Sequence, residues 1–149
     1  MLIYAVDDMK GFLDALVRAA QGAQPQAEIE GFTRGAQVLA RMAERPCDIL
    51  LTDVDMPGMN GIELAQAVHE QNPATEIVFV TGEAAYNLKQ MGVQVERCVY
   101  KPVTAERLAQ RLDELSVLPP FAIIPPQEER QAARPAGGLL GWLWQHFLH

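Results

Sequence analysis

This sequence has no long apolar run, no basic run and only two cysteines among its 149 residues. No apolar stretch reaches the roughly 18 residues of a membrane span, and the opening MLIYAVDD lacks the basic start of a signal peptide. We therefore expect a cytoplasmic protein without a transmembrane segment. Cys47 and Cys98 have no metal-ligand spacing and are too few for a disulfide framework, so both are predicted to be buried thiols.

Positive charge is also scarce. The chain has three lysines, a formal net charge of −7 and a pI of about 4.9. Sequence-independent binding to nucleic acid depends on neutralising phosphates with Lys and Arg. Direct nucleic-acid binding is therefore not expected.

The composition changes once along the chain. The length and the 49% hydrophobic content fit one domain with its own core. Five of the ten prolines fall within 119–135, and the chain ends in GGLLGWLWQHFLH. We predict a domain over residues 1–118, a Pro-rich linker over 119–137 and an apolar aromatic segment over 138–149.

The apolar end segment is predicted to make contacts through Trp142, Trp144 and Phe147. Four possibilities stay open: contact with its own domain, contact with a second copy of the chain, contact with another protein that receives the aromatic side chains as anchors, or disorder. The segment is too short to span a bilayer.

Strand and helix patterns alternate along residues 1–118. Short apolar runs predict strands at 2–6, 27–32, 47–52, 77–80 and 95–100. Five helices are predicted. Apolar residues at helical spacing mark the first, at Phe12, Leu13, Leu16, Val17 and Ala20, and the second, over Val38–Ala43. The third starts at Asn60, the fourth lies around 84–91, and the fifth starts at Thr104. Five strand–helix pairs with short connections predict a right-handed, doubly wound α/β fold with a parallel sheet.

Polar residues follow four of the five predicted strands. These residues are Asp7 and Asp8, Asp53, Thr81 and Lys101. The carboxyl ends of parallel strands meet at one edge of the sheet, where ligands bind. Three carboxylates at one edge need a cation, and oxygen ligands without His or Cys suit Mg²⁺. Asp53 then becomes a candidate nucleophile toward phosphorus, with Lys101 and Thr81 contacting phosphoryl oxygens.

The motifs YAVDD, ILLTDVDMPGMNGIEL, IVFVTG and YKPVT, in this order, make the chain resemble the receiver domain of bacterial two-component response regulators, of the chemotaxis-regulator type. The resemblance covers about residues 1–118. It implies a flavodoxin-like five-stranded sheet of order 2-1-3-4-5 with five helices. It also implies a histidine kinase as the phosphate donor.

The same resemblance assigns roles by motif position. Asp53 would be the phosphoacceptor, and Asp7, Asp8, Asp53 and the backbone carbonyl of Asp55 would hold Mg²⁺ or Mn²⁺. Thr81 would be the switch hydroxyl, Lys101 would contact the phosphoryl group, and Pro102 would follow a cis peptide bond. The chain would then be a switch and not a turnover enzyme, with a downstream protein or its own dimer as its output.

Two positions depart from the family pattern. Cys98 stands three residues before the lysine, where the family usually carries Tyr or Phe, and Tyr100 directly precedes Lys101. The stretch between Thr81 and Lys101 is short, which predicts an abbreviated helix after the fourth strand.

Two other functions stay open. The fold could be a docking module with an idle acceptor site. Alternatively, Asp53 and Asp55 form a D-x-D that is similar to haloacid-dehalogenase-type phosphatases. In those enzymes the D-x-D precedes the acidic pair along the chain, whereas Asp7 and Asp8 come first here.

Overall fold

The computed structural model describes residues 1–125 of the chain. The predicted contact residues Trp142, Trp144 and Phe147, the whole apolar end segment 138–149 and the later part of the predicted linker lie outside the described residues. Within residues 1–125, no helix combines the length and apolar character needed to cross a membrane.

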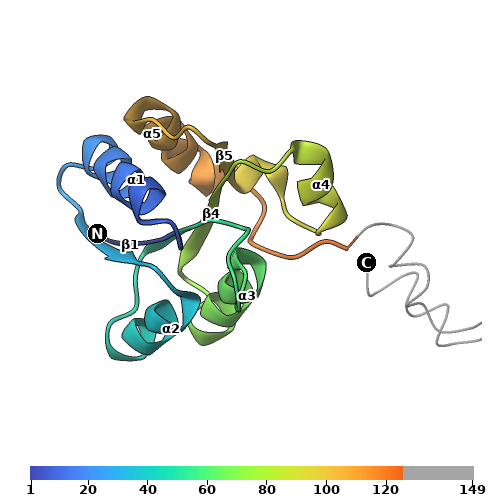
Figure 1. Cartoon of the computed structure of the whole chain (residues 1–149), viewed down its shortest axis with the longest axis horizontal. Coiled ribbons are helices and arrows are strands. Elements are labelled where there is room, and N and C mark those ends of the chain that lie inside the picture. Colours follow the sequence, from blue (N-terminus) through green and yellow to red (C-terminus); the bar gives the residue numbers. More distant parts are fainter. Residues whose placement is uncertain (126–149) are drawn as a thin grey trace, which may run out of the picture.

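Five parallel strands form one sheet in the order β2-β1-β3-β4-β5, which confirms the flavodoxin-like prediction (Figure 1). The strands are β1 (Leu2–Val6), β2 (Glu28–Phe32), β3 (Ile49–Thr52), β4 (Glu76–Thr81) and β5 (Cys98–Tyr100). β2 lies at one edge and is partly exposed, whereas β1 and β3 are buried along their full lengths. This contrast follows from the continuous apolar sequence of the central strands.

Helices cover both faces of the sheet. They are α1 (Lys10–Ala23), α2 (Gly35–Glu44), α3 (Gly61–Gln71), α4 (Ala85–Gln90) and α5 (Ala105–Glu114). α1 and α5 lie side by side on one face, and α2 and α3 lie together on the other (Figure 1). Successive residues of a strand point to opposite faces of the sheet, so each strand contributes to both cores. Tyr4, Leu50 and Phe79 pack toward α2 and α3, and the residues next to them in each strand pack toward α1 and α5.

Local sequence signals fix several helix ends. Asn60 and Glu63 form a complete capping box at the start of α3, as their spacing predicts. The Thr104 side chain accepts a hydrogen bond from the backbone N–H of Arg107 at the start of α5. α4 has only six residues, which confirms the expectation of an abbreviated helix.

The last strand is shorter than predicted. Residues Val95–Arg97, expected as its beginning, form a 3₁₀ turn, and β5 starts at Cys98. The Arg97 guanidinium explains the difference. It is buried and donates hydrogen bonds to Glu76, to the Gln94 side chain and to the Ile77 carbonyl. A buried guanidinium needs these acceptors, and the turn brings Gln94 to it.

Residues 119–124, predicted to begin a linker, pack onto the domain as a strap. The Phe121 side chain is buried against Phe79 and His69. Gln94 binds the strap twice, donating to the Pro120 carbonyl and accepting from the Ala122 N–H, while Arg97 donates to the Pro119 carbonyl. In Figure 1 this segment runs from the sheet past α4.

Gly92 lies directly against the strap, where a larger residue would not fit. Its φ of +82° favours glycine, and a Cβ there would lie 2.8 Å from a methyl of Ile123. The Gly92 carbonyl also accepts a hydrogen bond from the Ile124 N–H at 2.8 Å. The ordered domain therefore extends beyond α5, at least through these residues.

We predict that Phe121→Ala lowers the free energy of unfolding by about 3 kcal/mol, because it removes a buried ring from the core. Urea denaturation of both proteins measures the difference. Tyr86→Ala is the matched control, since that ring on α4 is 71% exposed. Equal stability of Phe121→Ala and the unaltered protein would show that the strap does not contribute to the core.

Candidate functional site

Three carboxylates meet at the carboxyl edge of the sheet. Asp7 and Asp8 follow β1, and Asp53 follows the neighbouring strand β3. One carboxylate oxygen from each lies within 4.8 Å of the others. Asp7 and Asp53 are buried, whereas Asp8 is exposed. The group therefore has a buried inner side and an open outer side.

Lys101 brings one positive charge to these acids. It follows β5, and its Nζ lies 2.8 Å from Asp7 Oδ2 and 3.0 Å from Asp53 Oδ2. The Lys101–Pro102 peptide bond that follows is cis. The lysine and the carboxylates predicted to lie at this edge of the sheet thus form one cluster.

The pKa directions reflect burial and mutual charge. Burial raises the pKa of Asp53, the hydrogen bond and charge of Lys101 oppose this, and the Asp7 carboxylate raises it further, so the net direction is upward. Burial lowers the pKa of Lys101, but its hydrogen bonds to Asp7 and Asp53 outweigh burial and raise it. Lys101 thus stays charged while Asp53 carries an electrostatic cost when ionised.

The donor set fits a hard divalent cation. Asp7, Asp8 and Asp53 offer oxygen atoms alone, which Mg²⁺ prefers, and the exposed Asp8 leaves room for the waters that this ion keeps. One ammonium cannot balance three carboxylates, so a cation would relieve the remaining repulsion.

The start of α3 lies close against the backbone of Asp53 and Val54. The Gly61 N–H donates to the Val54 carbonyl at 2.8 Å, and a Cβ at position 61 would lie 1.7 Å from the Asp53 carbonyl oxygen. Only glycine allows α3 to start this close to the acceptor strand. The Asp55 N–H donates to Asp53 Oδ1 at 3.4 Å, so Asp55 belongs to the turn after β3.

A cavity of about 680 Å³ opens beside these groups. Thr81, Gly82 and Glu83 line it together with Asp53 and Lys101. The Thr81 hydroxyl accepts a hydrogen bond from the Glu83 N–H at 3.1 Å, which leaves its own proton free to donate. The cavity therefore combines a carboxylate, an ammonium and a hydroxyl donor.

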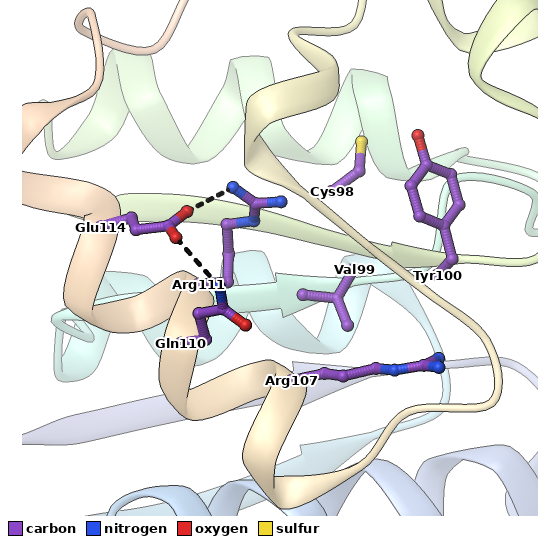
Figure 2. Close-up of a pocket in the computed structure, with 7 residues that line it drawn as sticks. All are labelled: Cys98, Val99, Tyr100, Arg107, Gln110, Arg111 and Glu114. Atoms are coloured by element: carbon purple, nitrogen blue, oxygen red, sulfur yellow. Dashed lines mark hydrogen bonds and ion pairs between the residues drawn. The ribbon is translucent and has the colours of Figure 1, made fainter.

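Cys98 and Tyr100 lie on the same face of β5, and Val99 points the other way (Figure 2). Cys98 is buried, as predicted, and burial raises the pKa of its thiol to about 12. Tyr100 pairs in register with Thr81 of β4. Tyr100, the aromatic residue directly before Lys101, therefore lies beside Thr81 on the neighbouring strand.

Figure 2 also shows the surface next to β5. A pocket of about 370 Å³ lies between β5 and α5, where Arg111 forms an ion pair with Glu114 at 2.8 Å. It contains none of the carboxylate cluster and is separate from the site.

Phe12 lies in α1, so the helix predicted from its spacing is confirmed, but its side chain is at the rim of the apolar stripe and not in the core. The side chain is 46% exposed and lies over Lys101, with the ring centroid 4.2 Å from Nζ. A three- to four-residue period cannot separate a core position from one at the rim of the stripe.

Comparison with known proteins identifies the family. A family model described as the response regulator receiver domain matches residues 3–113. The chain belongs to this family. Receiver domains are signalling domains of two-component systems and not turnover enzymes, so the family match does not favour the phosphatase alternative.

Individual relatives agree with this family. CpdR of Brucella abortus (strain 2308), a response regulator receiver protein, is 42% identical over 83 residues, which are 55% of this chain and 64% of that protein. Sensor protein EvgS of Escherichia coli (strain K12) is 33% identical over 90 residues, 59% of this chain and 8% of EvgS. The chain thus spans less than two thirds of either relative.

Among solved structures, the chemotaxis response regulator CheY4 of Vibrio cholerae superposes with a TM-score of 0.66 at 29% identity. The match covers 76% of this chain and 97% of CheY4. The receiver fold therefore accounts for most of the residues that the structure describes.

For this receiver domain we predict that, without metal, Asp53→Asn is more stable than the unaltered protein at neutral pH. The raised pKa of Asp53 means that folding favours its protonated form, so this contribution is lost as the pH rises through the folded pKa. The difference in melting temperature should open above about pH 4, near the ordinary carboxyl pKa, and vanish below it.

Thermal unfolding across pH in EDTA measures this difference. Asp14→Asn, at an exposed position of α1, is the control and should show no such divergence. A constant difference between Asp53→Asn and the unaltered protein at every pH would contradict the electrostatic interpretation.

Proposed function

We propose that this receiver domain is a phosphorylation-dependent switch that accepts a phosphoryl group on Asp53 from a histidine kinase and signals through protein contacts. The position of Lys101 Nζ, within hydrogen-bonding distance of both Asp7 and Asp53 at the edge of the cavity, carries this proposal. An ammonium there can neutralise charge on an incoming phosphoryl group.

The transfer would proceed by attack of an Asp53 carboxylate oxygen on phosphorus. The new bond is the Oδ–P bond of an acyl phosphate, and the bond between phosphorus and the donor breaks. With a phosphohistidine donor, the imidazole nitrogen keeps the electron pair of the P–N bond and takes a proton. Lys101 would contact one phosphoryl oxygen, and the Thr81 hydroxyl would donate to another.

Asp7, Asp8 and Asp53 would hold Mg²⁺ at this site, with the Asp55 carbonyl as the further ligand that the family resemblance implies. Bound there, the ion would supply positive charge opposite the phosphoryl oxygens.

The structural change that follows phosphorylation would begin at Thr81. Its hydroxyl now accepts from Glu83, and a hydrogen bond to a phosphoryl group would change this contact and the start of α4. Tyr100 pairs in register with Thr81, so its partly exposed ring would be one of the neighbours of such a movement. A downstream protein or a second copy would read the changed surface.

We predict one added phosphoryl group per chain after incubation with Mg²⁺ and acetyl phosphate, measured by intact-protein mass. Asp53→Asn and an EDTA-treated sample should show none, because the acceptor oxygen and the cation are missing. No adduct on folded protein, together with no Mg²⁺-dependent beryllofluoride binding, would favour the idle docking module instead.

We predict that Glu83→Ala and Asp55→Ala each slow hydrolysis of the phosphorylated protein roughly fivefold. Both residues line the cavity beside Asp53, where a carboxylate can accept a hydrogen bond from the attacking water. One such bond contributes about 1 kcal/mol. The decay of the adduct after removal of acetyl phosphate measures the rate, and rates equal to that of the unaltered protein would reject this role.

A further inference from the structure

We propose that Phe12 is a positioning residue for Lys101, and that its aromatic face holds the ammonium in place for phosphoryl transfer. This inference rests on the proposed function, because it assigns a role within the same site. Its physical basis is attraction between a cation and the negative face of an aromatic ring.

The geometry around Lys101 Nζ supports this role. Two of its contacts are the carboxylates of Asp7 and Asp53, at 2.8 and 3.0 Å. The centroid of the Phe12 ring lies 4.2 Å from the same nitrogen, within the range of a cation–π contact. The ammonium is thus held by two anions and by an aromatic face.

Core packing does not explain this phenylalanine. Leu13 and Leu16 of α1 are buried in the core, whereas Phe12 is 46% exposed. Phe12 also lines the cavity that contains Asp53 and Lys101. It lies in the first turn of α1, directly after the connection that supplies Asp7 and Asp8.

The ring position is fixed independently of the lysine. Leu13 and Leu16 anchor α1 in the core that α5 shares, so the helix presents Phe12 at the cavity whatever Lys101 does. Lys101, by contrast, reaches the site on a flexible four-carbon stem. A rigid aromatic face beside a flexible cation lowers the freedom that the ammonium must lose when it contacts a phosphoryl oxygen.

Substitutions at position 12 distinguish the attraction between the Phe12 ring and the Lys101 ammonium from the effect of side-chain volume. Leucine keeps apolar bulk without an aromatic face, whereas tyrosine and tryptophan keep the face. We expect Phe12→Leu to slow phosphorylation by acetyl phosphate and Mg²⁺ roughly two- to fivefold, the range of an exposed cation–π contact. Phe12→Tyr and Phe12→Trp should retain most of the rate. Tyr86→Leu, an exposed aromatic outside the site, is the matched control.

Stepwise fluorination of the ring at position 12 provides a finer test. Fluorine withdraws electron density from the ring face while the shape changes little, so the rate should fall with each added fluorine and approach that of Phe12→Leu. The melting temperature should stay constant through the series, because the ring is half exposed.

A second measurement tests the contact without metal or phosphate. In the metal-free protein, the Lys101 side-chain protons beside the Phe12 ring should have NMR signals shifted upfield by the ring current, and Phe12→Leu should remove the shift. Unshifted signals in the unaltered protein would overturn the proposed contact.

The outcomes separate this inference from the proposed function. An Asp53-dependent adduct that forms equally fast in the unaltered protein, Phe12→Leu and the fluorinated proteins would reject the role of Phe12 and leave the switch intact. Complete absence of an adduct in the unaltered protein would reject the proposed function, and with it any role of Phe12 in transfer.

Discussion

The site depends on one charge arrangement, the contact of the Lys101 ammonium with the carboxylates of Asp7 and Asp53. The three side chains follow three different strands, and only a parallel sheet of this order brings them to one edge. Because one cation faces three carboxylates, the cluster keeps an excess of negative charge. That excess makes the site suitable for a divalent cation and, with it, for a phosphoryl group.

Repulsion among the three carboxylates opposes folding, and the apolar packing of the two cores offsets this repulsion. Every residue of β1 and β3 is buried, so the strand ends that present Asp7 and Asp53 cannot shift without disturbing both faces of the sheet. Gly61 adds a local constraint, because α3 starts against the backbone of Asp53. The site is therefore positioned by packing that lies outside it.

Sequence patterns predicted the parts of this protein that depend on local signals. The buried strands, the Asn60 capping box and the polar strand ends all follow from neighbouring residues. The strap was not predictable, because its prolines are typical of a linker and Phe121 finds its partners Phe79 and His69 far away in the chain. Phe12 fits a helix stripe by spacing, and only the folded position of Lys101 reveals its contact.

The region beyond Thr81 is less constrained by packing than the central strands. α4 has six residues and buries only Leu88, so few apolar contacts hold it. The central strands, by contrast, are fixed from both faces. A phosphoryl group on Asp53 would add negative charge beside Thr81, and the least constrained neighbour would adjust first. The strap binds the Gly92 carbonyl just after α4, so it limits how far that adjustment can extend along the chain.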